Sequence, residues 1–421
     1  MAIEAPRGTQ DMLPAQSGKW HALEAKIREL CKRYGFREIR TPVFEHTELF
    51  QRGVGDTTDV VQKEMYTFLD KGERSITLKP EGTAGAARAY VQHAMFNEPQ
   101  PIKLYYMTPV FRYEKPQAGR LREHHQFGVE VFGAPTADAD AEVISLAWNL
   151  FQGLGLRNLT LHLNSIGCPK CRPQYHEALR AYLQEKLSLL CDTCNQRFEK
   201  KPLRILDCKS EICQAQTRNA PKSIDHLCPE CREHLAQLEA RLEALGIRYE
   251  IDPYIVRGLD YYTKTVFEII SPDIGAQATV CGGGRYDGLI ETVGGPATPG
   301  MGFGMGLERL LLALESLGIE IDEPCGEDVY VATMGEAAKS AGMALAKVLR
   351  DRGLRVETDL CGRSFKAQFK YATKQGARFV ATIGDNELAA GAVRLKNMET
   401  GEQREIPLTT AGEAIEREVR A

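Results

Sequence analysis

The chain has 421 residues, of which 43% are hydrophobic and 26% charged, and its formal net charge is −4. This length predicts roughly three domains. A weakly acidic chain is not held on nucleic acid by bulk charge, so any RNA contact must use local basic patches. The N-terminal segment lacks the apolar core of a signal peptide, and no apolar run reaches the roughly 18 residues of a transmembrane helix. We therefore expect a cytoplasmic protein that does not enter a membrane.

The first part of the chain predicts helices and strands in alternation. Residues 18–34 and 138–152 carry apolar side chains at helical spacing. Segment 111–133 predicts two strands joined by a polar loop. In the returning strand, period-two geometry places Gln126 and Glu130 on one face with a glycine between them. This pattern fits a polar notch with a carboxylate at its edge, and it fits a solvent-facing strand surface equally well.

The second part resumes strand character at residues 247–271 and then predicts glycine-rich turns at 282–289 and 294–300. Residues 302–318 predict a glycine-rich strand that enters a helix, with Arg309 opposite the apolar stripe of that helix. After a break at 321–328, strands alternate with helices. This alternation predicts a separate α/β domain with a partly parallel sheet.

Neither common phosphate-binding signature is present, because the chain has no G-x-x-x-x-G-K-[ST] loop and no G-x-G-x-x-G opening a helix in a βαβ unit. An ATP site would therefore depend on arginines on an antiparallel platform. Arg112, Arg120 and Arg309 are the candidates, since a guanidinium binds phosphate bidentately and stacks on adenine. Each of them taken singly is ordinarily a surface charge.

Six segments carry a resemblance to a known family. Three resemble the class II aminoacyl-tRNA synthetase motifs, the first of which contributes to a dimer interface: residues 34–45, 111–133 and 302–314. Three more are similar to the histidine-binding signatures of histidyl-tRNA synthetase: residues 78–85, 257–268 and 282–289. The N-terminal residues 6–14 match as well, so the resemblance covers nearly the whole chain.

The resemblance implies an α+β fold. We expect a class II catalytic domain with an antiparallel-sheet core and helices at 1–325, interrupted by a cysteine-rich insertion domain at 168–246. A C-terminal α/β anticodon-binding domain is expected at 326–421. The implied function is that of a histidine–tRNA ligase, an ATP-dependent homodimer that forms histidyl-adenylate with magnesium and transfers histidine to tRNA(His), releasing AMP and diphosphate.

The resemblance also implies the substrate contacts. Histidine would be bound by Glu81, Thr83 and Gln126 at its α-ammonium, and by Glu130 with Tyr262 or else Tyr261 at its imidazole. Gly82 also belongs to the implied histidine-binding residues. Arg112 and Arg257 would bracket the α-phosphate as the catalytic residues. The rest of ATP would contact Glu114 at the adenine amino group, Arg120 at the outer phosphates, and His124 and Arg309 at the adenine ring. Lys115 and Gln117 would meet the tRNA acceptor end.

Two of these assignments have alternatives. Many class II enzymes carry phenylalanine where this chain has His124, and a histidine stacks on adenine more weakly and with a charge that depends on pH. Simple strand alternation places Arg257 and Tyr262 on opposite faces. Either the run bends between them, or Tyr261 is the partner of the imidazole.

Eight of the twelve cysteines fall between Cys168 and Cys231. Three C-x-x-C pairs and one C-x4-C pair indicate metal in a reducing compartment, and they allow up to two four-thiolate structural zinc sites. The predicted ligands, whose pairing into sites the spacing leaves open, are Cys168, Cys171, Cys191, Cys194, Cys208, Cys213, Cys228 and Cys231. Reduced, buried cysteines without metal are the alternative.

A basic stripe in the C-terminal region lies in a segment with no acidic residue from 360 to 384, and from Lys366 onward its charges are four residues apart. Its members are Arg363, Lys366, Lys370, Lys374 and Arg378. Four-residue spacing keeps these charges on one side of a helix, which suits RNA phosphates and also an ordinary solvated face. Since the resemblance places an anticodon-binding domain here, we expect RNA contact.

Three other classes of protein are compatible with parts of this sequence. A synthetase-like regulatory subunit of ATP phosphoribosyltransferase usually lacks the anticodon domain and parts of the 257–262 signature. A class II synthetase for glycine, proline or threonine would not need Glu130 and the tyrosine pair. A zinc-held RNA-binding module would not need the arginine set.

Overall fold

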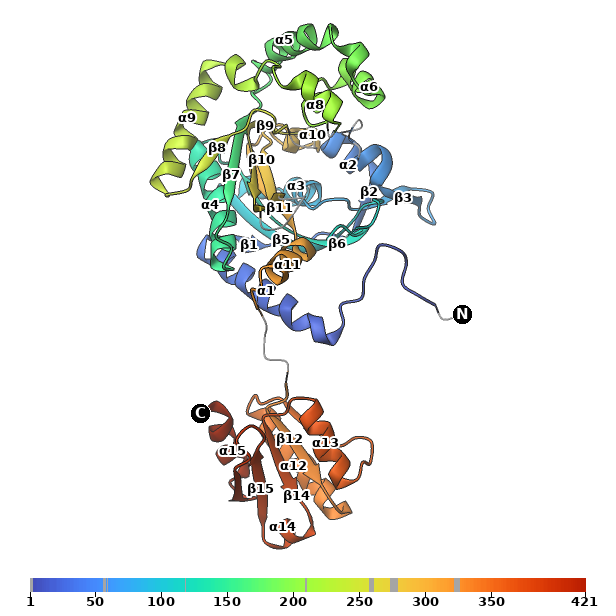
Figure 1. Ribbon diagram of the computed structural model, residues 1–421, viewed down its shortest axis with the longest axis vertical. Coiled ribbons are helices and arrows are strands. Elements are labelled where there is room, and N and C mark those ends of the chain that lie inside the picture. Colours follow the sequence, from blue (N-terminus) through green and yellow to red (C-terminus); the bar gives the residue numbers. More distant parts are fainter. Residues whose placement is uncertain are drawn as a thin grey trace. The chain divides into compact units, whose positions relative to one another are not determined.

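The computed structural model describes residues 3–55, 58, 60–117, 119–208, 210–256, 261–272, 279–321 and 326–421 (Figure 1). It divides into two compact units, Met1–Ile321 and Asp322–Ala421, each of which is described here by itself.

The first unit is built on an eight-stranded sheet. Its strands lie in the order β1 (Arg37–Glu38), β5 (Ile102–Phe111), β6 (Glu123–Phe132), β11 (Gly300–Gly306), β10 (Thr279–Arg285), β9 (Thr263–Ile270), β7 (Thr160–Ser165) and β8 (Tyr249–Ile251). The pairs β1–β5 and β7–β8 at the two edges are parallel, and the pairs between them are antiparallel. The expected α+β fold with an antiparallel core is confirmed.

One face of this sheet packs on four helices. They are α1 (Pro14–Arg33), α4 (Ala137–Gly153), α9 (Pro229–Ala244) and α11 (Leu307–Ser316). Alternation along β6 turns Phe127, Val129 and Val131 into this core, where all three are buried. The helix expected at 18–34 begins earlier, at Pro14, because the fixed φ of proline suits the first turn of a helix.

The opposite face of the sheet is covered by α3 (Thr83–Gln92) and α10 (Leu289–Thr292), and α2 (Thr47–Phe50) packs on α3 (Figure 1). A small antiparallel sheet of β2 (Phe44–His46), β4 (Ser75–Leu78) and β3 (Tyr66–Leu69) lies in the same region. Gln126, Gly128 and Glu130 of β6 point to this face. The solvent-facing alternative is therefore wrong, since Glu130 is completely buried.

The glycine-rich turn expected at 282–289 is wrong for its first residues, because Gly282, Gly283 and Gly284 lie within strand β10. Close approach explains these glycines. A Cβ on Gly283 would lie 2.2 Å from the carbonyl oxygen of Gly302, and one on Gly284 would lie 2.9 Å from the ring of Tyr262. The glycines let neighbouring groups touch the strand.

The cysteine-rich insertion leaves the sheet after β7 and returns through α9 to β8. Its helices are α5 (Arg172–Gln184), α6 (Asp192–Lys200), α7 (Leu203–Leu206) and α8 (Glu211–Thr217), and they gather beyond one end of the sheet (Figure 1). They enclose an apolar core of their own, which includes Tyr175, Leu179 and Ile205.

The second unit is an α/β domain with a five-stranded sheet. The strands lie in the order β13 (Val356–Thr358), β12 (Val329–Thr333), β14 (Phe379–Ile383), β15 (Ala392–Asn397) and β16 (Gln403–Pro407). The first three are parallel, as expected, and the last two form an antiparallel hairpin. Helices α12 (Glu336–Asp351), α13 (Phe365–Lys374), α14 (Asp385–Ala389) and α15 (Ala411–Arg420) complete the unit. Across both units, the described residues include no helix long and apolar enough to cross a membrane.

Candidate active site

A buried carboxylate lies at one end of the site. Glu130 accepts a hydrogen bond from the hydroxyl of Tyr106 at 2.9 Å and another, very short, from the hydroxyl of Tyr286. Burial raises the pKa of Glu130 to about 8, although both hydroxyls oppose the shift. Gly302 leaves room for this group, since a Cβ there would lie 2.1 Å from Oε2 of Glu130. The site thus holds an acceptor suited to a polar N–H.

The loop before α3 passes over β6 beside this carboxylate. The main-chain N–H of Gly82 donates to Oε1 of Gln126 at 2.8 Å. The carboxylate of Glu81 accepts from the N–H groups of Thr83 and Ala84, both at 2.8 Å, and so caps α3. Burial raises the pKa of Glu81, which these hydrogen bonds and the charge of Arg112 oppose. The three residues expected to hold the α-ammonium therefore lie together with Gly82.

Tyr261 and Tyr262 line the same region. Their ring centroids are 4.7 Å apart, and Tyr261 also packs edge-on against Tyr286 at 5.4 Å. Burial raises the pKa of Tyr261 well above its usual value, and the charges of Tyr262, Glu81 and Glu130 act in the same direction. Tyr261 is therefore close to both carboxylates, while Tyr262 lies over Gly284 of β10.

The expected ATP residues continue along the same strand face. His124 and Glu130 are six residues apart on β6, which corresponds to roughly 20 Å of extended chain. Arg112 donates from Nε to the carbonyl of Pro80 at 2.8 Å. Its charge acts on both Glu81 and His124, so the guanidinium is within electrostatic range of the histidine residues and of the ATP residues of the site. Burial, together with Arg112, lowers the pKa of His124 to about 4, and the ring is neutral at pH 7.

The loop between β5 and β6 carries the remaining motif residues. Arg120 forms a very short ion pair with Glu114. Gly119 packs on α11, where an added Cβ would lie 3.6 Å from the Cα of Arg309. Burial lowers the pKa of Arg309, and so does the charge of Arg120. The loop thus brings these groups together above α11.

Two further loop residues and one catalytic candidate complete the set. Lys115 and Gln117 are exposed on the loop. Gln117 also lines a cavity of about 300 Å³ with Trp20 of α1 and Leu312 of α11. Arg257 lies outside the described residues.

The sequence of this chain matches known families in both units. Residues 8–310 match the family described as histidyl-tRNA synthetase, and residues 328–418 match the anticodon binding domain. A histidine–tRNA ligase of Caldanaerobacter subterraneus subsp. tengcongensis is 59% identical over 415 residues, which cover 99% of this chain and 100% of the relative. The chain belongs to the histidyl-tRNA synthetase family.

Solved structures agree with this assignment. The crystal structure of apo histidyl-tRNA synthetase from S. aureus is 42% identical with a TM-score of 0.85, and the match covers 98% of this chain and 100% of that one. A structure from Bacillus halodurans C, described as an ATP phosphoribosyltransferase regulatory subunit/histidyl-tRNA synthetase, is 21% identical with a TM-score of 0.64. That match covers 91% of this chain and 99% of the other, and it shows a shared fold alone.

Sequence reasoning missed the two tyrosines that hold Glu130. A signal for each was present. Tyr106 occupies a β5 position directly opposite Gly128, and a Cβ on that glycine would lie 2.4 Å from the tyrosine hydroxyl. Tyr286 belongs to the 282–289 family signature but received no role of its own.

A buried ionic network behind the site was also missed. The carboxylate of Asp140 on α4 accepts from Thr265 of β9 at 2.6 Å and forms a very short contact with Arg285 of β10. His234 of α9 contacts the same carboxylate through Nε2 at 2.7 Å. Asp140 and Arg285 are completely buried. Burial alone would raise the pKa of Asp140, but the attraction of Arg285 and His234 outweighs burial, and the pKa of Asp140 is lowered. The network joins four elements, α4, β9, β10 and α9, and Tyr286 directly follows the Arg285 that it holds.

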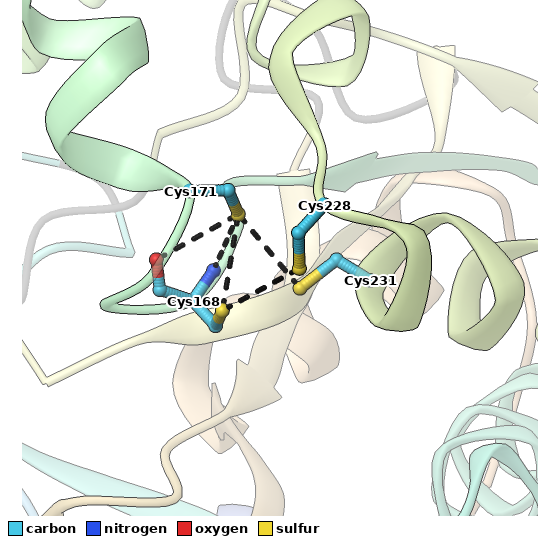
Figure 2. A group of neighbouring side chains, drawn as sticks. All are labelled: Cys168, Cys171, Cys228 and Cys231. Carbon is cyan, nitrogen blue, oxygen red and sulfur yellow. Dashed lines mark hydrogen bonds between the residues drawn. The ribbon is translucent and has the colours of Figure 1, made fainter.

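The eight clustered cysteines form two groups of four. Cys168 and Cys171 meet Cys228 and Cys231, and Figure 2 shows the sulfur atoms of these two segments turned toward one another. The second group contains Cys191, Cys194, Cys208 and Cys213. In each group the sulfur atoms all lie within 4.8 Å of one another.

Sulfur–sulfur distances in the groups match a metal shell. They are 3.8 Å for Cys168–Cys171, 3.8 Å for Cys168–Cys228 and 3.9 Å for Cys171–Cys231. A tetrahedral zinc site with Zn–S bonds of about 2.3 Å has sulfur–sulfur edges of about 3.8 Å. In the second group the Cys191–Cys208 distance is 3.9 Å. The donor set therefore fits zinc.

The basic stripe of the second unit is shorter than expected. Lys366 and Lys370 are exposed on α13. Arg363 precedes the helix and pairs with Asp359 at 2.8 Å, whereas Arg378 follows the helix. The free part of the stripe is the helix itself.

Proposed function

We propose that the protein activates histidine with ATP and transfers it to the 3′ end of tRNA(His), releasing diphosphate and AMP. The observation that carries this proposal is the buried Glu130 with its two tyrosine partners, at the end of a strand face that continues to Arg112 and His124. A buried acceptor at this place is suited to an imidazole N–H.

Recognition of histidine would use both ends of the molecule. Glu130 would accept from one imidazole nitrogen, and Tyr261 or Tyr262 would bond the other. Glu81, Thr83 and Gln126 would hold the α-ammonium, with Gly82 keeping the loop close to the ring of Tyr106. An analogue without either ring nitrogen would leave a buried polar group unpaired, and this loss gives the site its specificity.

The activation step is an in-line displacement. A carboxylate oxygen of histidine attacks the α-phosphorus, the bond to the β-phosphate oxygen breaks, and diphosphate leaves. Arg112 and Arg257 would stabilise the charge that develops on the α-phosphate oxygens without a dedicated base. The hydrogen bond of Arg112 to the carbonyl of Pro80, next to Glu81, and its charge effect on His124 support this role.

The rest of ATP would follow the strand face and the loop. His124 would stack on adenine as a neutral ring, opposite Arg309, and Glu114 would accept from the adenine amino group. Arg120 would bind the outer phosphates. Glu268 of β9 acts electrostatically on Arg309 and would supply a carboxylate ligand to the magnesium ion that accompanies ATP, since magnesium prefers oxygen ligands.

Transfer would bring tRNA to both units. The terminal ribose hydroxyl attacks the carbonyl carbon of the adenylate, and AMP leaves. The exposed Lys115 and Gln117 would meet the acceptor end. The exposed Lys366 and Lys370 on α13 would contact phosphates of the anticodon region.

The assembly proposed here is a homodimer in the cytoplasm. Phe44 and Leu69, in the small sheet beside the first motif, are 56% and 67% exposed, and such apolar side chains support burial against a second copy. Every described cysteine is a free thiol, which supports a reducing compartment. We place the boundary between the catalytic and anticodon-binding domains at 325/326.

The insertion would hold two structural zinc ions, one in each group of four cysteines. Closed four-thiolate shells leave no position for a substrate, so the ions would stabilise the insertion without taking part in the reaction.

The test is amino-acid-dependent exchange of labelled diphosphate into ATP with each of the twenty standard amino acids, for wild type and Arg257→Ala. Exchange with histidine alone, lost in the variant, is the expected result. A folded, zinc-loaded wild type that exchanges with none of them would favour a regulatory subunit, and exchange with a different amino acid would favour another synthetase.

A further inference from the structure

We propose that the zinc site formed by Cys168, Cys171, Cys228 and Cys231 positions the histidine pocket, so that loss of this ion weakens histidine binding. We call it the proximal site, and the site of Cys191, Cys194, Cys208 and Cys213 the distal site. The inference rests on the proposed function and adds a role for one particular ion.

The proximal site ties together the two ends of the insertion. Cys168 and Cys171 follow β7, where the chain leaves the catalytic sheet, and Cys228 and Cys231 begin α9, where the chain returns (Figure 2). On binding, the thiols release their protons to solvent and one ion joins all four sulfur atoms. The ion therefore fixes the position of α5 and α9 relative to the edge of the sheet.

A first connection from this site to the pocket runs through Arg172, the residue after Cys171. Its Nη2 donates to the carbonyl of Tyr262 at 2.7 Å and to that of Gly167 at 3.2 Å. The N–H of Lys264 donates to the same Gly167 carbonyl at 2.9 Å. The cysteine turn thus holds the main chain at a tyrosine that lines the pocket.

A second connection runs through α9. His234 lies one turn after Cys231 and contacts Asp140, which also binds Arg285. Tyr286, the next residue, donates to Glu130. A displaced α9 would withdraw one partner from a completely buried carboxylate, and uncompensated buried charge is costly. The first connection ends at Tyr262 and the second at Glu130, so together they reach both sides of the pocket that would contact the imidazole.

The distal site differs in its position. Its four cysteines lie between residues 191 and 213 among α6, α7 and α8. All four belong to the core of the insertion itself or pack against it. Neither connection described above begins there. Loss of the distal ion should therefore loosen the insertion more than the pocket.

The experiment measures zinc per chain and the KM values for histidine and ATP in diphosphate exchange, on the full-length protein purified without chelator. Cys228→Ser removes a proximal ligand and Cys208→Ser a distal one. Cys361→Ser is the matched control, since Cys361 is an exposed thiol in the second unit. Arg172→Lys keeps all eight cysteines but removes the guanidinium fork.

The expected result for Cys228→Ser is one zinc in place of two and a roughly tenfold higher KM for histidine, with the KM for ATP unchanged. Arg172→Lys should keep both ions and raise the KM for histidine in the same direction. The increase in Cys208→Ser should be smaller than in Cys228→Ser.

Two results would overturn the inference while leaving the proposed function intact. One is a wild type that catalyses histidine exchange but binds no zinc. The other is an Arg172→Lys variant whose KM for histidine equals that of the control Cys361→Ser. This second result overturns the inference even if Cys228→Ser fails to fold. A zinc-loaded wild type without histidine exchange overturns the proposed function, and the inference with it.

Discussion

Replacing Glu130 by glutamine should stabilise the ligand-free protein against unfolding, by an amount that grows with pH. The pKa of Glu130 rises from 4.5 to about 8 on folding because the carboxyl is completely buried. Between these values the folded state binds more protons than the unfolded state, so the stability of the wild type falls as pH rises. Glutamine has nearly the same shape and does not titrate.

The size of the effect follows from the pKa shift. Each unit corresponds to about 1.4 kcal/mol, so from pH 5 to pH 8 the stability difference between the variants should grow by roughly 3 kcal/mol in favour of glutamine. Histidine should reverse the order, because it stabilises only a protein that binds it and Glu130→Gln has lost the charged acceptor.

The assay is urea unfolding of both proteins at pH 5, 6, 7 and 8, without ligand and with saturating histidine. Comparing the two proteins at each pH cancels the titration of the groups they share. A difference between the unfolding midpoints of the two proteins that is the same at every pH would refute the reasoning, since Glu130 would then be ionised in the folded protein without cost.

Three further experiments, each with its own substitutions, test separate parts of the account. Arg112→Ala should lower histidine-dependent exchange by roughly 100-fold or more while circular dichroism is unchanged, and a loss under threefold would contradict a role at the α-phosphate. Of Tyr261→Phe and Tyr262→Phe, only the one that removes the imidazole partner should raise the KM for histidine at constant KM for ATP; equal, small effects in both would remove the tyrosine from recognition. Charge reversal of Lys366 and Lys370 to glutamate should raise the KM for tRNA and leave diphosphate exchange intact, and an unchanged KM for tRNA would make the stripe a solvated face.

Local patterns were sufficient to predict most elements of the fold. The helix at 138–152 and the strand–helix unit at 302–318 have periodic apolar residues, and both are present. Of the two strands expected within 111–133, the second is β6 (Glu123–Phe132), whereas the first lies earlier in the chain because β5 ends at Phe111. The glycines at 282–284 led to the wrong prediction of a turn, because from sequence alone a glycine indicates a tight turn and a close contact to a strand equally well. Here the close contact holds, with Tyr262 lying against Gly284.

Long-range pairing explains what the sequence did not predict about the site. Tyr106 and Glu130 lie on the neighbouring strands β5 and β6, and Tyr286 directly follows β10, so the order and register of the sheet decide that they meet. The same applies to Asp140, Arg285 and His234, whose separation in the chain hides the network. Cysteine spacing identified eight ligands but not their grouping, which depends on the return of the insertion beside its own starting point.

Transfer of labelled histidine to tRNA tests the central claim most directly. With ATP and magnesium, the full-length protein should charge a tRNA(His) transcript with histidine and leave a tRNA of another specificity uncharged. A tRNA(His) that stays uncharged, with zinc-loaded protein that still folds and binds histidine, would contradict the account.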